Sequence, residues 1–320
     1  MSAPVQDQEI QLGDGTVLAV RTTRPPASMA PRGSAVLVHG LASNARMWDA
    51  CAAAAAGAGL TCVAPDLRGH GRSPALAAAT AGLSPAQAGP YGTPTAADDV
   101  ARLIARGRDD GTLTGPVVLA GQSWGGNVVL TAAARHPGLV DALALVDGGW
   151  LRFDPAETFE RLWQRMAPAG WGGATWSEAQ ERIGGMVAGW GPHALPAIMA
   201  NLTTDGDGLV RNILDLDAHE QILRSLHDAD PRALYPAVTV PVLLAPAGGG
   251  PAASLVDEAL AGLADPRLRR YDGAHHDLHL QHPERLAADL VEVLGIPSHG
   301  PLPGSESSPS TTHTHPPERS

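Results

Sequence analysis

Short, continuous apolar runs alternate along the chain with longer stretches of helix-forming composition. Four of these runs are SAVLVHG, LTCVAPD, PVVLAGQ and ALALVDGG, at residues 34–40, 60–66, 116–122 and 142–149. Because they are apolar throughout, they fit strands that are covered on both faces, as in a parallel sheet. The helical stretches between them lie at residues 45–59, 93–107 and 125–137. This alternation predicts an α/β fold with a mostly parallel central sheet flanked by helices.

Turn and cap signals set several boundaries of these elements. Near the start, QEIQL and TVLAV flank the turn sequence GDG at residues 13–15, which predicts a β-hairpin. A long Gly-, Pro- and Ala-rich loop is expected after Asp66. In the helical stretch that follows it, Thr95 and Asp98 have the spacing of a capping box and predict the start of a helix.

The strand–helix rhythm breaks after the fourth apolar run. Residues 150–236 contain helical patterns, no good buried strand and many tryptophans. The rhythm returns at VTVPVLLAPA, with a helix, a short strand and a last helix after it. We therefore expect a core formed by residues 1–149 and 237–296, with residues 150–236 inserted as a helical cap. Residues 297–320, rich in Pro, Ser, Thr and His, predict a disordered tail.

Composition and charge narrow the possible classes. The chain is 44% hydrophobic and 17% charged, which is typical of a globular protein. Its net charge of −11 and the lack of a basic cluster argue against nucleic-acid or membrane binding. The two cysteines, Cys51 and Cys62, predict reduced core residues and no disulfide framework. With no secretory signal and no long apolar segment, a soluble cytoplasmic protein is expected, its oligomeric state open.

One short motif carries a specific chemistry. GQSWG, from Gly121 to Gly125, fits the G-x-S-x-G nucleophile elbow, and it lies between a buried strand and a helix as that motif requires. On such a strained turn, a Cβ atom two residues before or after the serine would collide with neighbouring chain. The motif predicts that Ser123 is a nucleophile.

Four segments in this order extend the pattern: LVHGLASNARMW, APDLRGHGRS, GQSWGGN and GAHHDLHLQHPE. With them the chain resembles the α/β-hydrolase fold superfamily from about Glu9 to Leu294. The resemblance implies a capped serine hydrolase. It also implies an oxyanion hole made by the amide N–H groups of Leu41 and Trp124, since the loop at His39–Gly40 occupies the family's position for it.

The resemblance implies further site residues. His39 shapes the oxyanion loop and, with Trp150, is expected at the substrate pocket. The base comes from the last loop, where the family's Gly-x-x-His pattern, begun at Gly273, ends on His276. Its neighbour His275 is the alternative. A metal site built from His276, His279 and His282 has no supporting Cys or carboxylate cage, so we expect no metal.

The acid departs from the commoner pattern of the family. After the strand VPVLLAP the chain reads PAGGGPAAS and offers no carboxylate before Asp257. Some members of the superfamily have the acid after the preceding strand instead, and in this chain Asp147 occupies that position. Asp147 is therefore the predicted acid, with Asp257 and Asp272 as alternatives. The order Ser123, Asp147, His276 then matches that of the superfamily.

These residues predict a serine hydrolase that cleaves a carboxylic ester or lactone through an acyl-enzyme on Ser123 and uses no cofactor. A serine rather than an aspartate at the elbow disfavours epoxide and halide chemistry. The Trp-rich cap favours an apolar small-molecule acyl substrate. Alternatives are an acyltransferase, a C–C or amide hydrolase on the same triad, or a non-enzymatic ligand receptor with the same fold.

Overall fold

A computed structural model describes residues 4–73, 89–248 and 253–297 of the chain. Most of the loop expected after Asp66 lies outside these residues, and so does the predicted tail from residue 298 onward. Within them, β-strands and α-helices follow one another in the order that the apolar runs predict.

An eight-stranded sheet forms the centre of the molecule, in the order β1-β2-β4-β3-β5-β6-β9-β10. The strands are β1 (Val5–Gln11), β2 (Val17–Thr23), β3 (Gly33–Val38), β4 (Leu60–Pro65), β5 (Val117–Gln122), β6 (Ala142–Val146), β9 (Val242–Ala245) and β10 (Pro266–Leu268). The strands from β4 to β10 pair in parallel, whereas β2 is antiparallel to both β1 and β4. The mostly parallel sheet and the N-terminal hairpin are thus confirmed.

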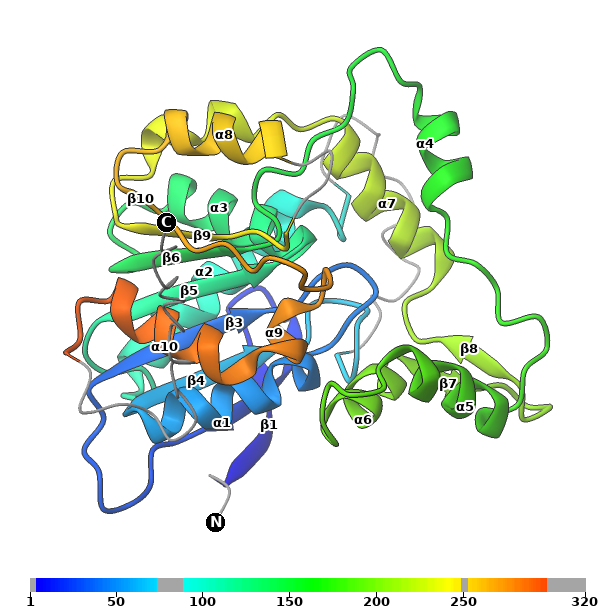
Figure 1. Cartoon of the computed structure of the whole chain (residues 1–320), viewed down its shortest axis with the longest axis horizontal. Coiled ribbons are helices and arrows are strands. Elements are labelled where there is room, and N and C mark those ends of the chain that lie inside the picture. Colours follow the sequence, from blue (N-terminus) through cyan, green and yellow to red (C-terminus); the bar gives the residue numbers. More distant parts are fainter. Residues whose placement is uncertain (1–3, 74–88, 249–252, 298–320) are drawn as a thin grey trace, which may run out of the picture.

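Helices cover both faces of the sheet (Figure 1). One face carries α1 (Asp49–Gly57) and α10 (Pro283–Val293), and the other carries α2 (Thr93–Asp109), α3 (Trp124–Arg135) and α8 (Ala253–Gly262). In strand β3, Val36 and Val38 pack on the α2/α3 side, and Ala35 and Leu37 pack on the α1/α10 side. A strand buried on both faces is mostly apolar, and the buried hydroxyl of Ser34 in this strand donates to Thr114 O at 2.9 Å.

The connection from β6 to β9 lies to one side of the sheet in Figure 1. It contains α4 (Phe159–Met166), α5 (Trp176–Met186), α6 (Ala194–Met199), β7 (Leu202–Thr204), β8 (Val210–Asn212) and α7 (Leu216–His227), followed by two short 3-10 helices. The helical patterns are confirmed, but the sequence did not predict the antiparallel hairpin β7–β8. We refer to residues 150–236 as the inserted segment. Its status as a separate cap domain stays a prediction.

The capping box predicted at Thr95 and Asp98 is wrong. Helix α2 begins two residues earlier, at Thr93, and Gly92 precedes it without a side-chain cap. Thr95 Oγ1 instead donates to Gly89 O at 3.3 Å, and Asp98 pairs with Arg135 at 3.0 Å. Pro94 suits the first turn because its missing N–H would have had no helical acceptor there, so the helix starts before the predicted cap.

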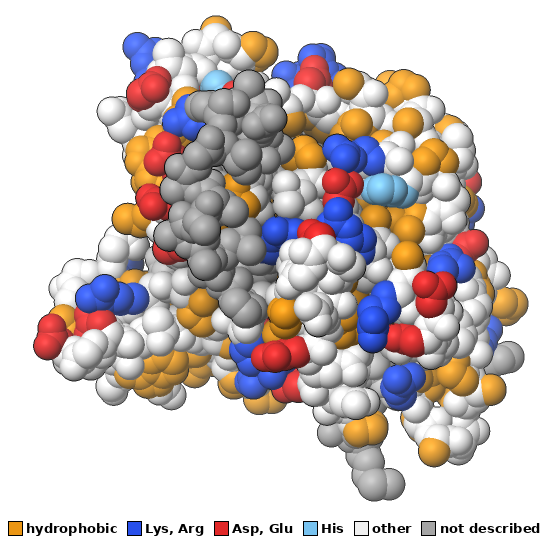
Figure 2. Space-filling view, turned by 180° about the vertical axis from the view of Figure 1, so that it is seen from behind, with side chains coloured by type: hydrophobic (Ala, Val, Ile, Leu, Met, Phe, Trp, Pro, Cys, Tyr) orange, Lys and Arg blue, Asp and Glu red, His pale blue; other side chains and the backbone are white. Residues whose placement is uncertain are grey.

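Other expectations drawn from composition can be compared with the structure. Cys51 and Cys62 are buried free thiols, and burial raises the pKa of both. In the view of Figure 2, basic side chains lie beside acidic ones rather than in a patch of one sign. Among the described residues, no helix has the length and apolarity needed to cross a bilayer.

Candidate active site

Ser123 occupies the sharp turn between the end of β5 and the start of α3. Its backbone has φ 55° and ψ −125°, a conformation that residues other than glycine rarely adopt. Such a residue costs about 1–3 kcal/mol and persists only where its surroundings fix it. Here Ser123 N–H donates to Val146 O at 3.0 Å, and Ser123 O accepts from Gly126 N–H at 2.9 Å. The turn thus fixes Ser123 at the carboxyl edge of the sheet.

The glycines of the motif have the steric purpose that the sequence indicated. A Cβ on Gly121 would strike the backbone of Gly125. A Cβ on Gly125 would lie 2.6 Å from Val38 O and 3.0 Å from His39 C. These atoms belong to paired strand and turn backbone, so they cannot move aside cheaply. Side chains are excluded at both positions because β3, β5 and α3 meet there.

Gly125→Ala is therefore expected to lower the free energy of unfolding by about 2–3 kcal/mol, the usual cost of overpacking a rigid site. Chemical denaturation followed by circular dichroism measures it. Gly185→Ala is the matched control, since a Cβ there meets nothing within 4 Å. In helix α5 the control should be neutral or stabilising by about 0.5 kcal/mol. Equal effects of the two changes would contradict the steric argument.

Asp147 and His276 lie side by side. His276 Nδ1 is 2.6 Å from Asp147 Oδ2. The other oxygen, Oδ1, accepts from Ala247 N–H at 3.0 Å, while Asp147 N–H donates to Ala245 O at 2.9 Å. Asp147 directly follows β6, has a positive φ of 42°, and its side chain is 16% exposed. The last residue of β9 and the chain just after it therefore hold Asp147 and its carboxylate, although Asp147 itself follows β6.

The alternative acids are exposed and do not contact His276. Asp257, within α8, and Asp272, after β10, are both exposed. In the part of the chain that the structure describes, neither forms a hydrogen bond or ion pair with His276. The structure thus brings together the predicted base and Asp147, and the catalytic roles of both stay predictions.

Two contacts bring the Asp147–His276 pair to the elbow. Gln122, the residue before Ser123, donates from Nε2 to His276 O at 3.1 Å. Gly148 packs so closely on Ser123 that a Cβ there would lie 2.7 Å from Ser123 Cα. Within the described residues no hydrogen bond joins Ser123 Oγ to His276, and catalytic hydrogen bonds of this kind often tighten only when substrate binds.

The role of Gln122 was not predicted from the sequence. Its side chain is buried at the end of an apolar strand, and a buried amide needs a partner. That polar residue at the end of β5 was the signal available in the sequence. The partner, the backbone of a loop 154 positions later, could not be seen there.

The pKa of His276 lies above its ordinary value of 6.5. Burial is the largest single influence and lowers the pKa. The hydrogen bond to Asp147 and the charges of Asp147 and Asp277 together raise the pKa by more than burial lowers it. The carboxylate therefore stabilises the imidazolium form of His276.

Two amides predicted for an oxyanion hole lie beside Ser123. Gly40, next to Leu41, packs on the elbow, since a Cβ there would be 3.1 Å from Ser123 Cβ. Trp124 is the first residue of α3, so its N–H has no acceptor within the helix. No hydrogen bond of the described residues uses the Leu41 N–H. Both donors thus remain available near the serine.

Two buried histidines brace the loop that contains Leu41. His39 Nε2 accepts from Leu67 N–H at 2.9 Å, and His70 Nε2 accepts from Ala42 N–H at 3.2 Å. Burial lowers the pKa of His39 to about 4 and that of His70 to about 3. Both rings are therefore neutral acceptors at neutral pH. That His39 shapes the oxyanion loop stays a prediction.

The predicted pocket residues are deeply buried. Trp150 is 1% exposed and belongs to the α2/α3 side of the core. Trp124 stacks on His70 and donates from Nε1 to Thr93 Oγ1 at 3.0 Å. The indole of Trp124 is thus part of the packing under the elbow. The pocket roles of His39 and Trp150 stay predictions.

The other histidines of the last loop lie in separate environments. His275 packs on Trp190 of the inserted segment, His279 is fully buried against Trp48, and His282 precedes the first residue of α10. Across the described ranges, no three His, Cys, Asp or Glu side chains are grouped so that they could hold a metal ion.

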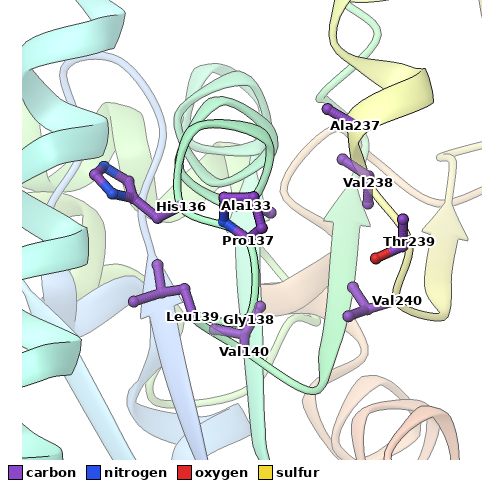
Figure 3. A pocket seen from close by; sticks show the side chains of 10 residues that line it. All are labelled: Ala133, His136, Pro137, Gly138, Leu139, Val140, Ala237, Val238, Thr239 and Val240. Carbon is purple, nitrogen blue, oxygen red and sulfur yellow. The ribbon is translucent and has the colours of Figure 1, made fainter.

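A small cleft of about 10 Å³ lies away from this site (Figure 3). Its lining comes from the end of α3, the turn after it and the segment before β9: Ala133, His136, Pro137, Gly138, Leu139, Val140, Ala237, Val238, Thr239 and Val240. Ser123 precedes the other end of α3. The cleft holds about one water molecule and has no part in the site.

Comparison with known proteins agrees with this fold. Residues 36–170 match the family model described as alpha/beta hydrolase fold. The chain is similar to the pimeloyl-[acyl-carrier protein] methyl ester esterase of Neisseria meningitidis, with 30% identity over 272 residues, which cover 80% of this chain and 92% of that protein. The chain belongs to the α/β-hydrolase fold family.

Two further similarities cover different shares of the chain. Lipase LipV of Mycobacterium tuberculosis is 34% identical over 110 residues, and this match spans about a third of each protein, 34% of the chain and 35% of the lipase. The crystal structure of E-2-(acetamidomethylene)succinate hydrolase superposes with a TM-score of 0.70 at 22% identity, covering 91% of this chain and all of that one. At that identity the likeness supports the fold alone.

Proposed function

We propose that this protein is a serine hydrolase that cleaves a carboxylic ester or lactone through an acyl-enzyme on Ser123. The observation that carries the proposal is the 2.6 Å hydrogen bond between His276 and Asp147, beside a serine on a strained strand-to-helix turn. The similar proteins of N. meningitidis and M. tuberculosis are named as an esterase and a lipase, which supports the same chemistry.

The arrangement suits two-step acyl transfer. Ser123 Oγ attacks the ester carbonyl carbon while His276 Nε2 accepts the hydroxyl proton. Asp147 keeps the other ring proton on Nδ1 and stabilises the imidazolium. The N–H groups of Leu41 and Trp124 stabilise the negative charge on the carbonyl oxygen, and the loss of one such donor costs about 3 kcal/mol.

His276 then donates its proton to the alkoxide, and the alcohol leaves. A water molecule gives its proton to His276 and attacks the acyl-enzyme, which releases the acid and restores Ser123. Every step uses side chains and amides of this chain, so the proposal needs no metal or organic cofactor. The substrate is a small molecule with an apolar acyl group, in keeping with the many tryptophans of the inserted segment.

Initial rates on p-nitrophenyl esters from acetate to decanoate test the proposal. Turnover should be saturable, with an optimum of chain length that reflects the size of the pocket. A fluorophosphonate probe should also label the protein on the peptide that contains Ser123, as mass spectrometry can show. Inertness towards every ester and towards the probe would refute the proposal.

The same assay across pH tests the base. The neutral form of His276 accepts the proton, so kcat/KM should rise with pH through the pKa of this residue in the free enzyme. Because that pKa is raised, the acid limb should have its midpoint above 6.5. Activity is then lost as pH falls through the midpoint. A flat profile between about pH 5 and 9 would exclude His276 as the base.

A further inference from the structure

The inserted segment is attached to the oxyanion loop through one buried side chain. Asn44, three residues after Leu41, is 2% exposed. Its Nδ2 donates to Ala197 O at 2.9 Å and to Asn201 Oδ1 at 2.5 Å. Ala197 is in α6, and Asn201 lies two residues after the end of that helix. Residues distant in the sequence are thus joined beside the loop that contains Leu41.

Asn44 also has a local role, and the two roles use different atoms. Its Oδ1 accepts from Arg46 N–H at 2.8 Å and caps the 3-10 helix η1 (Ala45–Trp48). The acceptor oxygen therefore serves the helix, while the donor nitrogen serves the inserted segment. A substitution that keeps only the oxygen can separate the two roles.

Asn201 has its own connection within the inserted segment. Its backbone O accepts from Ile213 N–H at 2.9 Å, just after strand β8. Asn201 thus links α6, the end of the hairpin and Asn44. A displacement of α6 or of the hairpin would move the partner of Asn44.

The inserted segment also contacts the loop of His276. His193 Nε2 lies 2.8 Å from Leu280 O, and Trp190 packs on His275 with ring centroids 4.9 Å apart. Between the two attachments, Met47 of η1 and Leu280 share a buried cluster with the segment's Val187, Ala194 and Ala197. One part of the inserted segment therefore touches both the oxyanion loop and the base loop.

The backbone between Leu41 and Asn44 needs such support. Ala42 has a positive φ of 54°, a strained conformation for an alanine. Its N–H is held by His70, and the next anchor along the chain is Asn44 with the Ala45 N–H, which donates to Asp66 Oδ1 at 2.7 Å. Loss of one anchor would let the strained turn relax and move the Leu41 amide.

We propose that the Asn44–Asn201 amide pair positions the oxyanion loop, so that the placement of the inserted segment sets the geometry of the Leu41 N–H. This inference rests on the proposed function. Asn44 and Asn201 are positioning residues that act through the Leu41 amide. The pair stabilises the transition state, where the charge on the substrate oxygen is largest, more than it stabilises bound substrate.

Substitutions at Asn201 test the inference by kinetics. Asn201→Ala should lower kcat by about tenfold to a hundredfold, as displacements near 1 Å at a reacting centre do. KM should change by less than about threefold, because the interaction acts mainly in the transition state. Asn201→Asp keeps an acceptor oxygen for Asn44 Nδ2 and should retain most of the activity. Each rate is divided by the concentration of active sites, which is measured by titration with the fluorophosphonate probe. Unfolded protein is thereby left out of the comparison.

Two further variants separate positioning from folding. Asn44→Ser keeps an oxygen that can cap η1 but is too short to reach Asn201 or Ala197 O, so it should lose at least as much kcat as Asn201→Ala. The double variant should lose no more than Asn44→Ser alone, since that change already removes the bond to Asn201. Asn212→Ala is the matched control, because its partner, Trp171 Nε1, lies within the inserted segment. It should keep full kcat.

Amide hydrogen exchange gives a readout that needs no turnover. Asn201→Ala should speed exchange in the peptide that covers residues 39–47, whereas Asn201→Asp and Asn212→Ala should not. Unchanged exchange and unchanged kcat in Asn201→Ala would overturn the inference while the hydrolase proposal stands. If the wild type is inert to esters and probe, the hydrolase proposal fails, and exchange alone decides whether the pair holds the loop.

Discussion

Ser123→Ala should lower kcat on the best p-nitrophenyl ester by about 10⁵- to 10⁶-fold and leave the fold intact, because loss of the attacking serine in such enzymes has an effect of that size. The alanine has no oxygen to form the acyl-enzyme, while the amides of Leu41 and Trp124 remain. The residual rate should therefore still exceed that of the uncatalysed reaction. Initial rates measure the loss of kcat, and far-UV circular dichroism shows whether the fold is intact.

The control for this change is Ser177→Ala, at an exposed serine in α5. It should leave kcat and KM unaltered. A Ser123→Ala protein that keeps more than about a tenth of the wild-type rate would mean that another group attacks the ester, since no triad enzyme keeps such activity without its nucleophile.

Asp147→Asn should lower kcat by about 10⁴-fold, the effect seen when the carboxylate of such a triad becomes an amide. An asparagine would present an N–H to His276 Nδ1 and favour the ring tautomer with its proton on Nε2, which cannot accept a proton from serine. The hydrogen bond and charge that raise the pKa of His276 are also lost, so the acid limb of the profile should move to lower pH.

Substitutions of the two alternative acids, Asp257 and Asp272, are the controls for Asp147→Asn. Asp257→Asn and Asp272→Asn change exposed side chains that form no hydrogen bond or ion pair with His276, and both should stay within about twofold of wild type, as surface substitutions usually do. Near-full activity of Asp147→Asn, together with a large loss in either of the others, would assign the acid to that residue instead.

Much of the core could be predicted because its strands are buried on both faces. The apolar runs that became β3 to β6 fit strands of a covered parallel sheet, and the glycines around Ser123 fit a turn at which β3, β5 and α3 approach closely. The predicted acid, Asp147, was implied by the resemblance to the α/β-hydrolase fold superfamily, together with the missing carboxylate after β9. The structure then places Asp147 at 2.6 Å from His276.

What could not be predicted depends on contacts distant in the sequence. Strands β7 and β8 have only three residues each, and their pairing with one another rather than an apolar pattern defines them. The positive φ of Asp147 has no sequence signal, because aspartate is compatible with many conformations. The link from Asn44 to Asn201 spans 157 positions. Such features arise from the assembled fold.

The connection between β6 and β9 has a consequence for how this architecture can change over time. Parallel neighbours need a crossover of only about a dozen residues, and here the crossover runs from Val146 to Val242. The entropic cost of a longer loop grows slowly with its length. Insertions and deletions are therefore tolerated in this stretch far better than in the sheet. Descendants of such a chain could acquire new substrates by altering the inserted segment alone, provided that each new version still supplies an acceptor for Asn44.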